Sequence, residues 1–295
     1  MEDLDLVQLY EISQRDFAMR VAALTLLFYD HALTLTDEVE LFWTKPWTIV
    51  TYLFFWSRYG GLAMILSGFF LLFGKGTINP GAGWFMIETW LGILSLWAVE
   101  IMLQLRLFAL YNCSRRLLFF VGSIFTLYVL SFVVLCVRTS YQQHGKSEPF
   151  FIAGHTYCIP MYPWKDKFTF WLIIASFDAL IIGLTLHRGY WQCHLRDTVP
   201  ALTDLCPTLL RDSLLYMFFT GFAYIANVIL CFVDNRYDLD TTGTASEFGF
   251  VMPIIMGSRM TINIRKVFTK HRQGPLTPSQ ISLAIPGLKE PTQYV

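Results

Sequence analysis

The stretch YDHALTLTDEVELFWTKPWTIVTYLFFWSRY, residues 29–59, decides the fold of this chain. It begins inside one apolar segment, crosses a short acidic turn flanked by tryptophans, and ends with Arg58 inside the next apolar segment. Tryptophan and tyrosine gather where the hydrocarbon of a membrane meets water. We therefore interpret residues 29–59 as a helical hairpin, two membrane helices joined by a tight loop.

The composition of the whole chain points to a lipid bilayer as the solvent and first partner. Of its 295 residues, 55% are hydrophobic and 15% are charged, whereas soluble chains carry roughly 25% charged residues. The formal net charge is zero, which gives no argument for a nucleic-acid partner. The N-terminus is acidic and has no basic region before its apolar run, so the first hydrophobic segment is expected to act as an uncleaved anchor.

Seven segments have the length and apolar character of spanning helices, which need about 20 mostly apolar residues. They lie at about 17–36, 47–73, 85–111, 117–137, 168–189, 209–233 and 248–266. The first and last are the weakest, because Arg20, Asp30 and His31 dilute one, and Pro253 and Arg259 interrupt the other. The predicted fold class is an all-α, polytopic membrane bundle of seven transmembrane helices, with six as the alternative.

This fold divides the chain into three regions. We expect an extracellular N-terminus at residues 1–16 and a seven-helix membrane domain at residues 17–270, which contains the hairpin 29–59. Residues 271–295 are rich in proline and have no apolar period, so they predict a disordered cytosolic tail.

The basic residues of the loops predict the orientation, because cytosolic loops carry an excess of Lys and Arg. With the N-terminus outside, twelve basic residues fall on the inner side and eight on the outer side. The inner residues are Lys45, Arg106, Arg115, Arg116, Arg188, Arg196, Arg211, Arg265, Lys266, Lys270, Arg272 and Lys289, and the outer ones are Arg15, Arg20, Lys75, Arg138, Lys146, Lys165, Lys167 and Arg236. We therefore predict an outer N-terminus and a cytosolic C-terminus, in the plasma membrane. The sequon Asn112-Cys113-Ser114 then lies in the cytosol, so a glycan on Asn112 would overturn this orientation.

Ionisable residues inside the predicted helices are the candidate functional residues. Each costs about 2.5–3.5 kcal/mol at the bilayer centre, so each needs a partner or a function. At a rise of about 1.5 Å per residue, Arg58, Asp178 and Arg259 all lie near the midplane. The predicted intramembrane ionic network consists of Asp30, Arg58, Glu100, Asp178 and Arg259. Within it, we expect Arg58 to pair with Asp30 or Glu100, and Arg259 to pair with Asp178 or Glu100.

Two interpretations of this network stay open at the level of sequence. The functional one is a ligand or proton site, or a two-state lock that a ligand biases. The structural one is a fixed pair that specifies helix packing. Asp30, Thr34 and Glu38 share one face of the first helix by their i, i+4 spacing. Glu88 stands near the outer end of its helix, where we expect it to reach water.

A block within residues 29–59 resembles the shared N-terminal block of a family of basidiomycete (mushroom-forming) fungal membrane proteins, catalogued as domain of unknown function 6533. The block consists of Tyr29, Asp30, Thr34, Glu38, Glu40, Trp43, Pro46, Arg58 and Tyr59. Weaker similarities are LRLFALYNCSRR (105–116), LLRDSLLYMFF (209–219) and GSRMTINIR (257–265). The resemblance implies a multi-pass fungal protein that is often described only as receptor-like.

The leading functional hypothesis is a receptor-like protein with the plan of a G-protein-coupled receptor. The helix count, the outer N-terminus, the basic inner loops and the long outer loop 138–167 favour it. It implies a small ligand from the outer side and a cytosolic signalling partner. Leu105-Arg106-Leu107 is similar to the arginine motif of the third receptor helix but lacks its acidic neighbour. The sixth segment lacks CWxP, and the seventh has MPIIM in place of NPxxY, so the similarity is one of plan.

Two other classes are weighed against the receptor. A transporter or proton-coupled carrier is motivated by Asp30, Glu100 and Asp178, although only Pro253 offers a broken helix. A membrane-embedded lipid hydrolase needs several histidines around zinc, and only His31 and His187 fall within or at the edge of a predicted helix. We therefore expect no enzyme, with no catalytic, cofactor-binding or metal-binding residues.

Overall fold

The computed structural model describes residues 6–73, 82–111, 113–143, 150–152, 155–157, 164–194, 202–237 and 243–273. These ranges hold seven long α-helices: α1 (Leu6–Glu38), α2 (Ile49–Phe73), α3 (Ala82–Leu110), α4 (Arg115–Gln143), α5 (Trp164–His194), α6 (Leu202–Tyr237) and α7 (Gly243–Gln273). A short π-helix, η1 (Val39–Trp43), continues α1. Two strands, β1 (Phe150–Ile152) and β2 (His155–Tyr157), pair antiparallel. Each of the seven predicted segments coincides with one helix.

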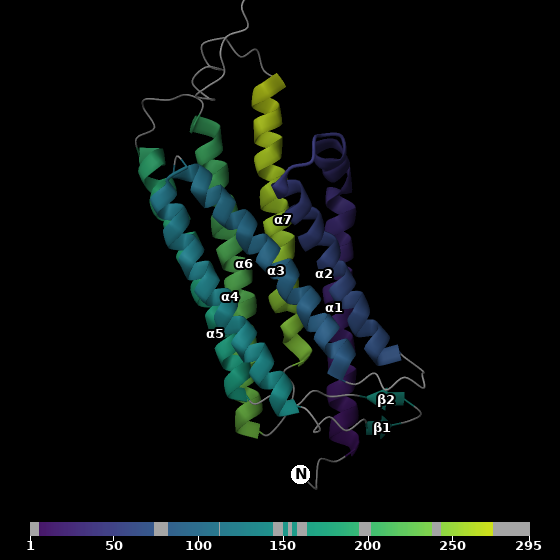
Figure 1. Ribbon diagram of the computed structural model, residues 1–295. Coiled ribbons are helices and arrows are strands. Elements are labelled where there is room, and N and C mark those ends of the chain that lie inside the picture. The colour runs from purple at the N-terminus through teal and green to yellow at the C-terminus, as the bar shows by residue number, and fades with distance from the viewer. Residues whose placement is uncertain are drawn as a thin grey trace, which may run out of the picture.

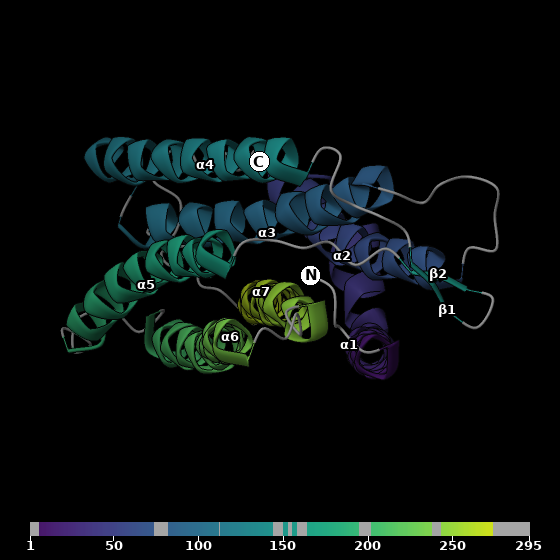
Figure 2. The same ribbon diagram turned by 90° about the horizontal axis from the view of Figure 1, so that it is seen from below.

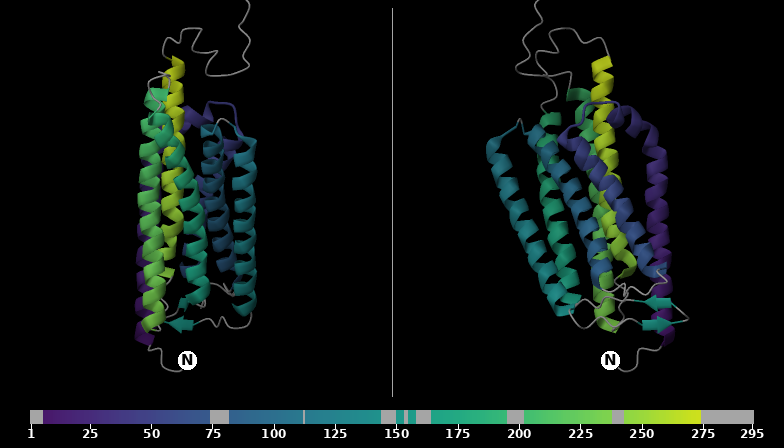
Figure 3. Two further views of the ribbon diagram at one scale, coloured as in Figure 1. Left: turned by 90° about the vertical axis from the view of Figure 1, so that its left-hand side faces the viewer. Right: turned by 45° about the vertical axis from the view of Figure 1, so that its right-hand side comes forward.

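The helices form an elongated bundle in which neighbours run up and down along one long axis (Figure 1). The start of α1 and the β1–β2 hairpin lie at one end, whereas η1 and the end of α7 lie at the other (Figure 3). The seven described helices alternate in direction and therefore bring the first and last described residues to opposite ends of the bundle.

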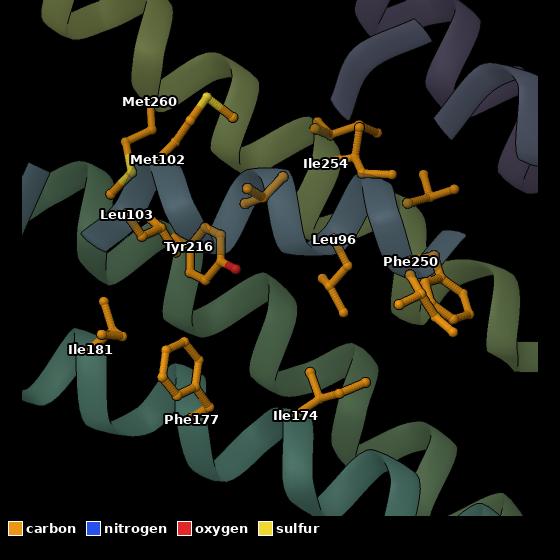
Figure 4. Packing of buried hydrophobic residues seen from close by; sticks show 14 of the residues in the cluster. Leu96, Met102, Leu103, Ile174, Phe177, Ile181, Tyr216, Phe250, Ile254 and Met260 are labelled. Atoms are coloured by element: carbon orange, nitrogen blue, oxygen red, sulfur yellow. The ribbon is translucent and has the colours of Figure 1, made fainter. Parts of the chain in front are cut away.

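Helix α7 is the centre of the packing. It contacts α1, α2, α3 and α6, and the end view shows it between α6 and α1 and next to α3, with α4 at the edge of the bundle (Figure 2). The apolar core next to it is built by Leu96 of α3, Ile174 of α5, Tyr216 of α6 and Ile254 of α7, all buried (Figure 4).

Five of the helices are long and apolar enough to cross a membrane. Their spans within the described ranges are Ile49–Phe69, Ile87–Leu110, Arg115–Arg138, Phe168–Tyr190 and Arg211–Phe232. Large apolar side chains cover their outer faces; Phe119 is 74% exposed and Phe222 is 70% exposed. Surfaces of soluble proteins rarely gather such side chains over a continuous area. The bundle is therefore that of a multi-pass membrane protein.

Helices α1 and α7, the two weakest segments in the sequence, are not among these five. The reason is visible in the packing, because both helices carry buried polar residues. Asp30 and Glu38 of α1 and Glu247 and Ser258 of α7 are all buried. Their low apolar content reflects side chains that face other helices of the bundle rather than its outer surface.

Several predicted boundaries differ from those of the structure. Helix α1 already begins at Leu6, within residues 1–16, expected to precede the first helix as an extracellular N-terminus, and α7 runs on to Gln273. The rest of the predicted tail, 274–295, lies outside the described residues. The outer loop predicted at 138–167 is shortened by α4, which continues to Gln143, and by α5, which begins at Trp164. The turn of the hairpin is reduced to residues 44–48, because η1 prolongs the first helix.

Candidate functional site

The side chain of Arg58 in α2 is buried against one face of α1. Its side chain is 1% exposed, and its Nε lies 2.7 Å from Oε2 of Glu38. Its Nη1 lies 3.6 Å from Oδ2 of Asp30. Its Nη2 donates to Oγ1 of Thr34 at 2.6 Å and to the carbonyl oxygen of His31 at 3.3 Å. Asp30, Thr34 and Glu38 are four residues apart, so successive turns of one helix surround a single guanidinium.

Glu38 is the member of this cluster that the sequence did not assign to the ionic network. The predicted first helix ended before it, whereas the structure continues the helix and buries Glu38 completely. Its Oε1 accepts hydrogen bonds from the Tyr59 hydroxyl at 2.7 Å and from Nε1 of Trp43 at 3.1 Å. The i, i+4 spacing with Thr34 was the signal that placed it on the same face.

Asp30 also binds the second intramembrane arginine. Nε of Arg259 in α7 lies 2.5 Å from Oδ1 of Asp30. The expected partners of Arg259, Asp178 and Glu100, are therefore wrong, because depth along the bundle does not say which helices are neighbours and α7 packs directly on α1. Asp30 is buried, but the Arg259 side chain is 43% exposed.

We call Asp30, Glu38, Arg58 and Arg259 the α1–α2–α7 network. Two carboxylates and two guanidiniums give it no net formal charge. Removing charges from water is expensive, and breaking a buried pair typically costs about 3–5 kcal/mol because the remaining charge is left uncompensated. The arrangement therefore holds three helices in one register.

Glu100 and Asp178 lie apart from this network, in a cluster with three tyrosines. Oε1 of Glu100 in α3 accepts a hydrogen bond from the Tyr128 hydroxyl at 2.8 Å. Oδ2 of Asp178 in α5 accepts from the hydroxyls of Tyr216 at 3.1 Å and Tyr224 at 3.0 Å. The expected pairing of Glu100 or Asp178 with an arginine does not occur among the described residues, because tyrosines of α4 and α6 occupy their faces.

A further ionic cluster lies near the N-terminal end of the bundle. Arg20 of α1 forms a close ion pair with Glu88 of α3 and lies 2.9 Å from Oε1 of Glu247 in α7. The expectation that Glu88 reaches water is wrong, because it is 6% exposed and bound by Arg20. Gly68 of α2 lies against this pair, and a Cβ there would overlap both the Arg20 guanidinium and the Glu88 carboxylate.

At the opposite end, α7 closes over the turn of the hairpin. Arg265 donates to the carbonyl oxygen of Leu41 at 2.8 Å and to Oγ1 of Thr51 at 2.8 Å. Its guanidinium lies 3.9 Å from the ring centroid of Phe42, within cation–π range. Next to it, Lys266 lies 2.6 Å from Asp37. The π-helix η1 presents Leu41 and Phe42 to these contacts.

Near this end, polar side chains also join α6 to α7 and α3. Asn263 of α7 donates to Oδ2 of Asp212 in α6 at 3.1 Å. Arg106, the arginine of the Leu105-Arg106-Leu107 motif in α3, lies close enough to Asp212 to interact with its charge. Sequence reasoning placed Arg106 on the inner side, near the inner end of the third helix, and did not identify Asp212.

The remaining residues of the family block lie outside the network. Tyr29 is exposed on α1, and Glu40 and Pro46 are exposed at the turn. Within the described ranges, no group of three His, Cys, Asp or Glu side chains is arranged to hold a metal ion.

Fold and site together define a multi-pass helical membrane protein whose first two helices and last helix are joined by buried charges. Residues 19–63 match a family of unknown function, DUF6533. The matched region spans most of α1, η1 and the first part of α2, and it contains Asp30, Glu38 and Arg58. A search among curated proteins gave no match.

Proposed function

We propose that this protein is a receptor-like, non-enzymatic membrane protein of the plasma membrane, with seven spans, an outer N-terminus and a cytosolic C-terminus. In this proposal the α1–α2–α7 network is a lock that holds α7 in one of two arrangements. One observation carries it: the single carboxylate of Asp30 is shared by Arg58 and Arg259.

The two arginines are held to different degrees, so Arg259 is the one that leaves when the lock opens. Arg58 is enclosed and has Glu38 as a second anion, whereas Arg259 is 43% exposed. When Arg259 leaves, Asp30 keeps Arg58 as a neighbour, so Asp30 and Glu38 share one guanidinium and neither carboxylate is left without a cation beside it. The shared cation lowers the cost of this second state, which a two-state element needs in order to populate it.

The contacts of α7 offer a route from the lock to the proposed cytosolic end. Arg265 and Lys266 bind the turn of the hairpin, and Asn263 binds Asp212 of α6. A displacement of α7 would therefore change the surface that a cytosolic signalling partner meets. The ligand in this proposal is small and enters from the outer side, where Arg20, Glu88 and Glu247 join α1, α3 and α7.

The lock is tested by Arg259→Gln in the full-length protein in lipid nanodiscs. We expect hydrogen exchange of the α7 backbone amides to rise by up to about fivefold, the change that a loss of about 1 kcal/mol produces, and capture of a G-protein α subunit in pulldown to increase. Arg116→Gln is the matched control, because Arg116 is an exposed arginine at the start of α4.

The outcomes separate the parts of the proposal. Unchanged exchange in α7 would show that Arg259 locks nothing. Faster exchange without capture of the α subunit would mean that the network only stabilises helix packing. It would rule out coupling to a G-protein α subunit.

A transporter or proton-coupled carrier is the second candidate, favoured by Glu100 and Asp178. These carboxyls are buried without an arginine or lysine partner in the described part of the chain. Proton uptake into vesicles that contain the purified protein, lost in Glu100→Gln, would support this candidate over the receptor.

A further inference from the structure

The cluster of Glu100, Asp178, Tyr128, Tyr216 and Tyr224 joins four helices that take no part in the α1–α2–α7 network. Glu100 lies on α3, Asp178 on α5, Tyr128 on α4, and the other two tyrosines on α6. All five residues are buried, and Figure 4 shows Tyr216 among the apolar side chains of the core. The cluster is therefore independent of the proposed lock.

Each carboxyl uses one oxygen and leaves the other without a partner. The tyrosine hydroxyls bind Oε1 of Glu100 and Oδ2 of Asp178. The remaining oxygens, Oε2 of Glu100 and Oδ1 of Asp178, are buried and accept no hydrogen bond in the structure. Asp178 is near enough to Glu100 to act on its charge. Each acid therefore has a buried oxygen that could carry a proton, and the charge of each acid acts on the other.

The charge of the cluster leads to the same conclusion. If both carboxyls were ionised, two negative charges would lie inside the bundle, and no basic side chain of the described ranges pairs with either of them. Like charges at close range disfavour joint ionisation, and desolvation disfavours it further. One proton removes half of the charge. The tyrosine hydroxyls that donate to the ionised carboxyl then stabilise the single negative charge that remains.

We propose that Glu100 and Asp178 form a proton-binding site, in which one of the two carboxyls holds a proton and the other is ionised. The titratable groups that act on the pair are Tyr128 from α4 and Tyr216 and Tyr224 from α6. The pair titrates as a unit, because loss of the proton from either acid creates the same doubly charged cluster.

The site makes the stability of the bundle depend on pH in a defined direction. The folded state binds one proton that the unfolded state, with ordinary carboxyls, has released at about pH 7. Stability then falls as pH rises, because the unfolded state is the one that binds fewer protons. The equilibrium constant for unfolding grows up to about tenfold for each pH unit over this range.

Infrared spectroscopy of the full-length protein in nanodiscs at about pH 7 tests the site directly, because ordinary carboxyls are ionised there. We expect the carbonyl band of a protonated carboxyl in the wild type, shifted when the sample is exchanged into heavy water. Glu100→Gln removes the like charge, so Asp178, with two hydroxyl donors, ionises and the band disappears. Asp212→Asn is the matched control, because Asp212 is another buried acid of the bundle and lies outside the cluster; its band persists.

Thermal unfolding between about pH 6 and pH 9 gives the second readout. We expect the wild type and Asp212→Asn to lose stability as pH rises, and Glu100→Gln to be insensitive over this range. A wild type without the protonated band would overturn the proposal. So would a wild type whose stability depends on sodium at constant ionic strength and not on pH, because a metal cation would then occupy the space between the acids.

Discussion

Arg58 is buried and has to satisfy its charge within the protein, and it does so with side chains from three successive turns of α1. Glu38 and Asp30 supply charge, and Thr34 supplies a neutral acceptor. A lysine could not replace it, because only a planar guanidinium directs donors toward several acceptors at once.

Replacement of Arg58 should therefore be severe. Arg58→Met keeps the volume but leaves Asp30 and Glu38 buried, and Glu38 without its cation. We expect a loss of about 3–5 kcal/mol in the free energy of unfolding, measured by denaturation in detergent with circular dichroism of the helices. Adding Glu38→Gln should recover part of this loss. If the double variant loses the sum of the two single losses, Glu38 and Arg58 are not coupled.

Replacement of Arg259 should be much milder. In Arg259→Gln, Asp30 retains Arg58, and the side chain removed is already 43% exposed. We expect a loss of about 1 kcal/mol or less, measured in the same denaturation series. A loss as large as that of Arg58→Met would contradict the unequal roles of the two arginines.

At the scale of the elements, Gly68 decides how closely α2 approaches α1 and α3. Its missing side chain leaves room for the Arg20–Glu88 ion pair, which a Cβ would overlap. Gly122 of α4 is different, because a Cβ there would meet no other atom within 4 Å.

The two glycines make a matched pair of substitutions. Gly68→Ala should destabilise the bundle by about 1–3 kcal/mol, since the buried ion pair must shift to admit the methyl group. Gly122→Ala should be neutral or gain up to about 1 kcal/mol, because alanine favours a helix over glycine. Melting temperatures of the purified variants in one detergent measure both effects. Equal losses would show that helix propensity, and not the ion pair, governs position 68.

The elements themselves were largely predictable, whereas their lateral contacts were not. Apolar runs located all seven helices, and the i, i+4 spacing of Asp30, Thr34 and Glu38 located the face of α1 that binds Arg58. The ends of α1 were missed, because a charged residue such as Glu38 fits a loop equally well. Only the position of its buried partner, Arg58, shows that Glu38 belongs to the helix. Arg259 was assigned to the wrong acids, because the rise per residue gives the depth of a side chain in the membrane but does not show which helices lie next to each other. The π-helix and the β1–β2 hairpin left no periodic signal.

At the scale of the whole molecule, the odd number of helices places the two ends of the described chain at opposite ends of the bundle. With the proposed orientation, an epitope tag at the N-terminus should bind antibody on intact cells. A tag at the C-terminus should bind only after permeabilisation, and Asn112 should carry no glycan. Antibody binding to the C-terminal tag on intact cells, or a glycan on Asn112, would reverse the orientation; both tags on one side would rule out seven spans.

The ion pair between Asp30 and Arg259 also bears on how the protein is made. The two residues are 229 positions apart, so α1 leaves the ribosome long before α7 exists. Throughout synthesis the first helix therefore carries a carboxylate that still lacks one of its two final partners. We expect insertion machinery to keep α1 near a polar surface until α7 arrives. A chain that stops before α7 has one carboxylate more than it has guanidiniums in this network, and we expect a cell to recognise such an incomplete copy by that charge.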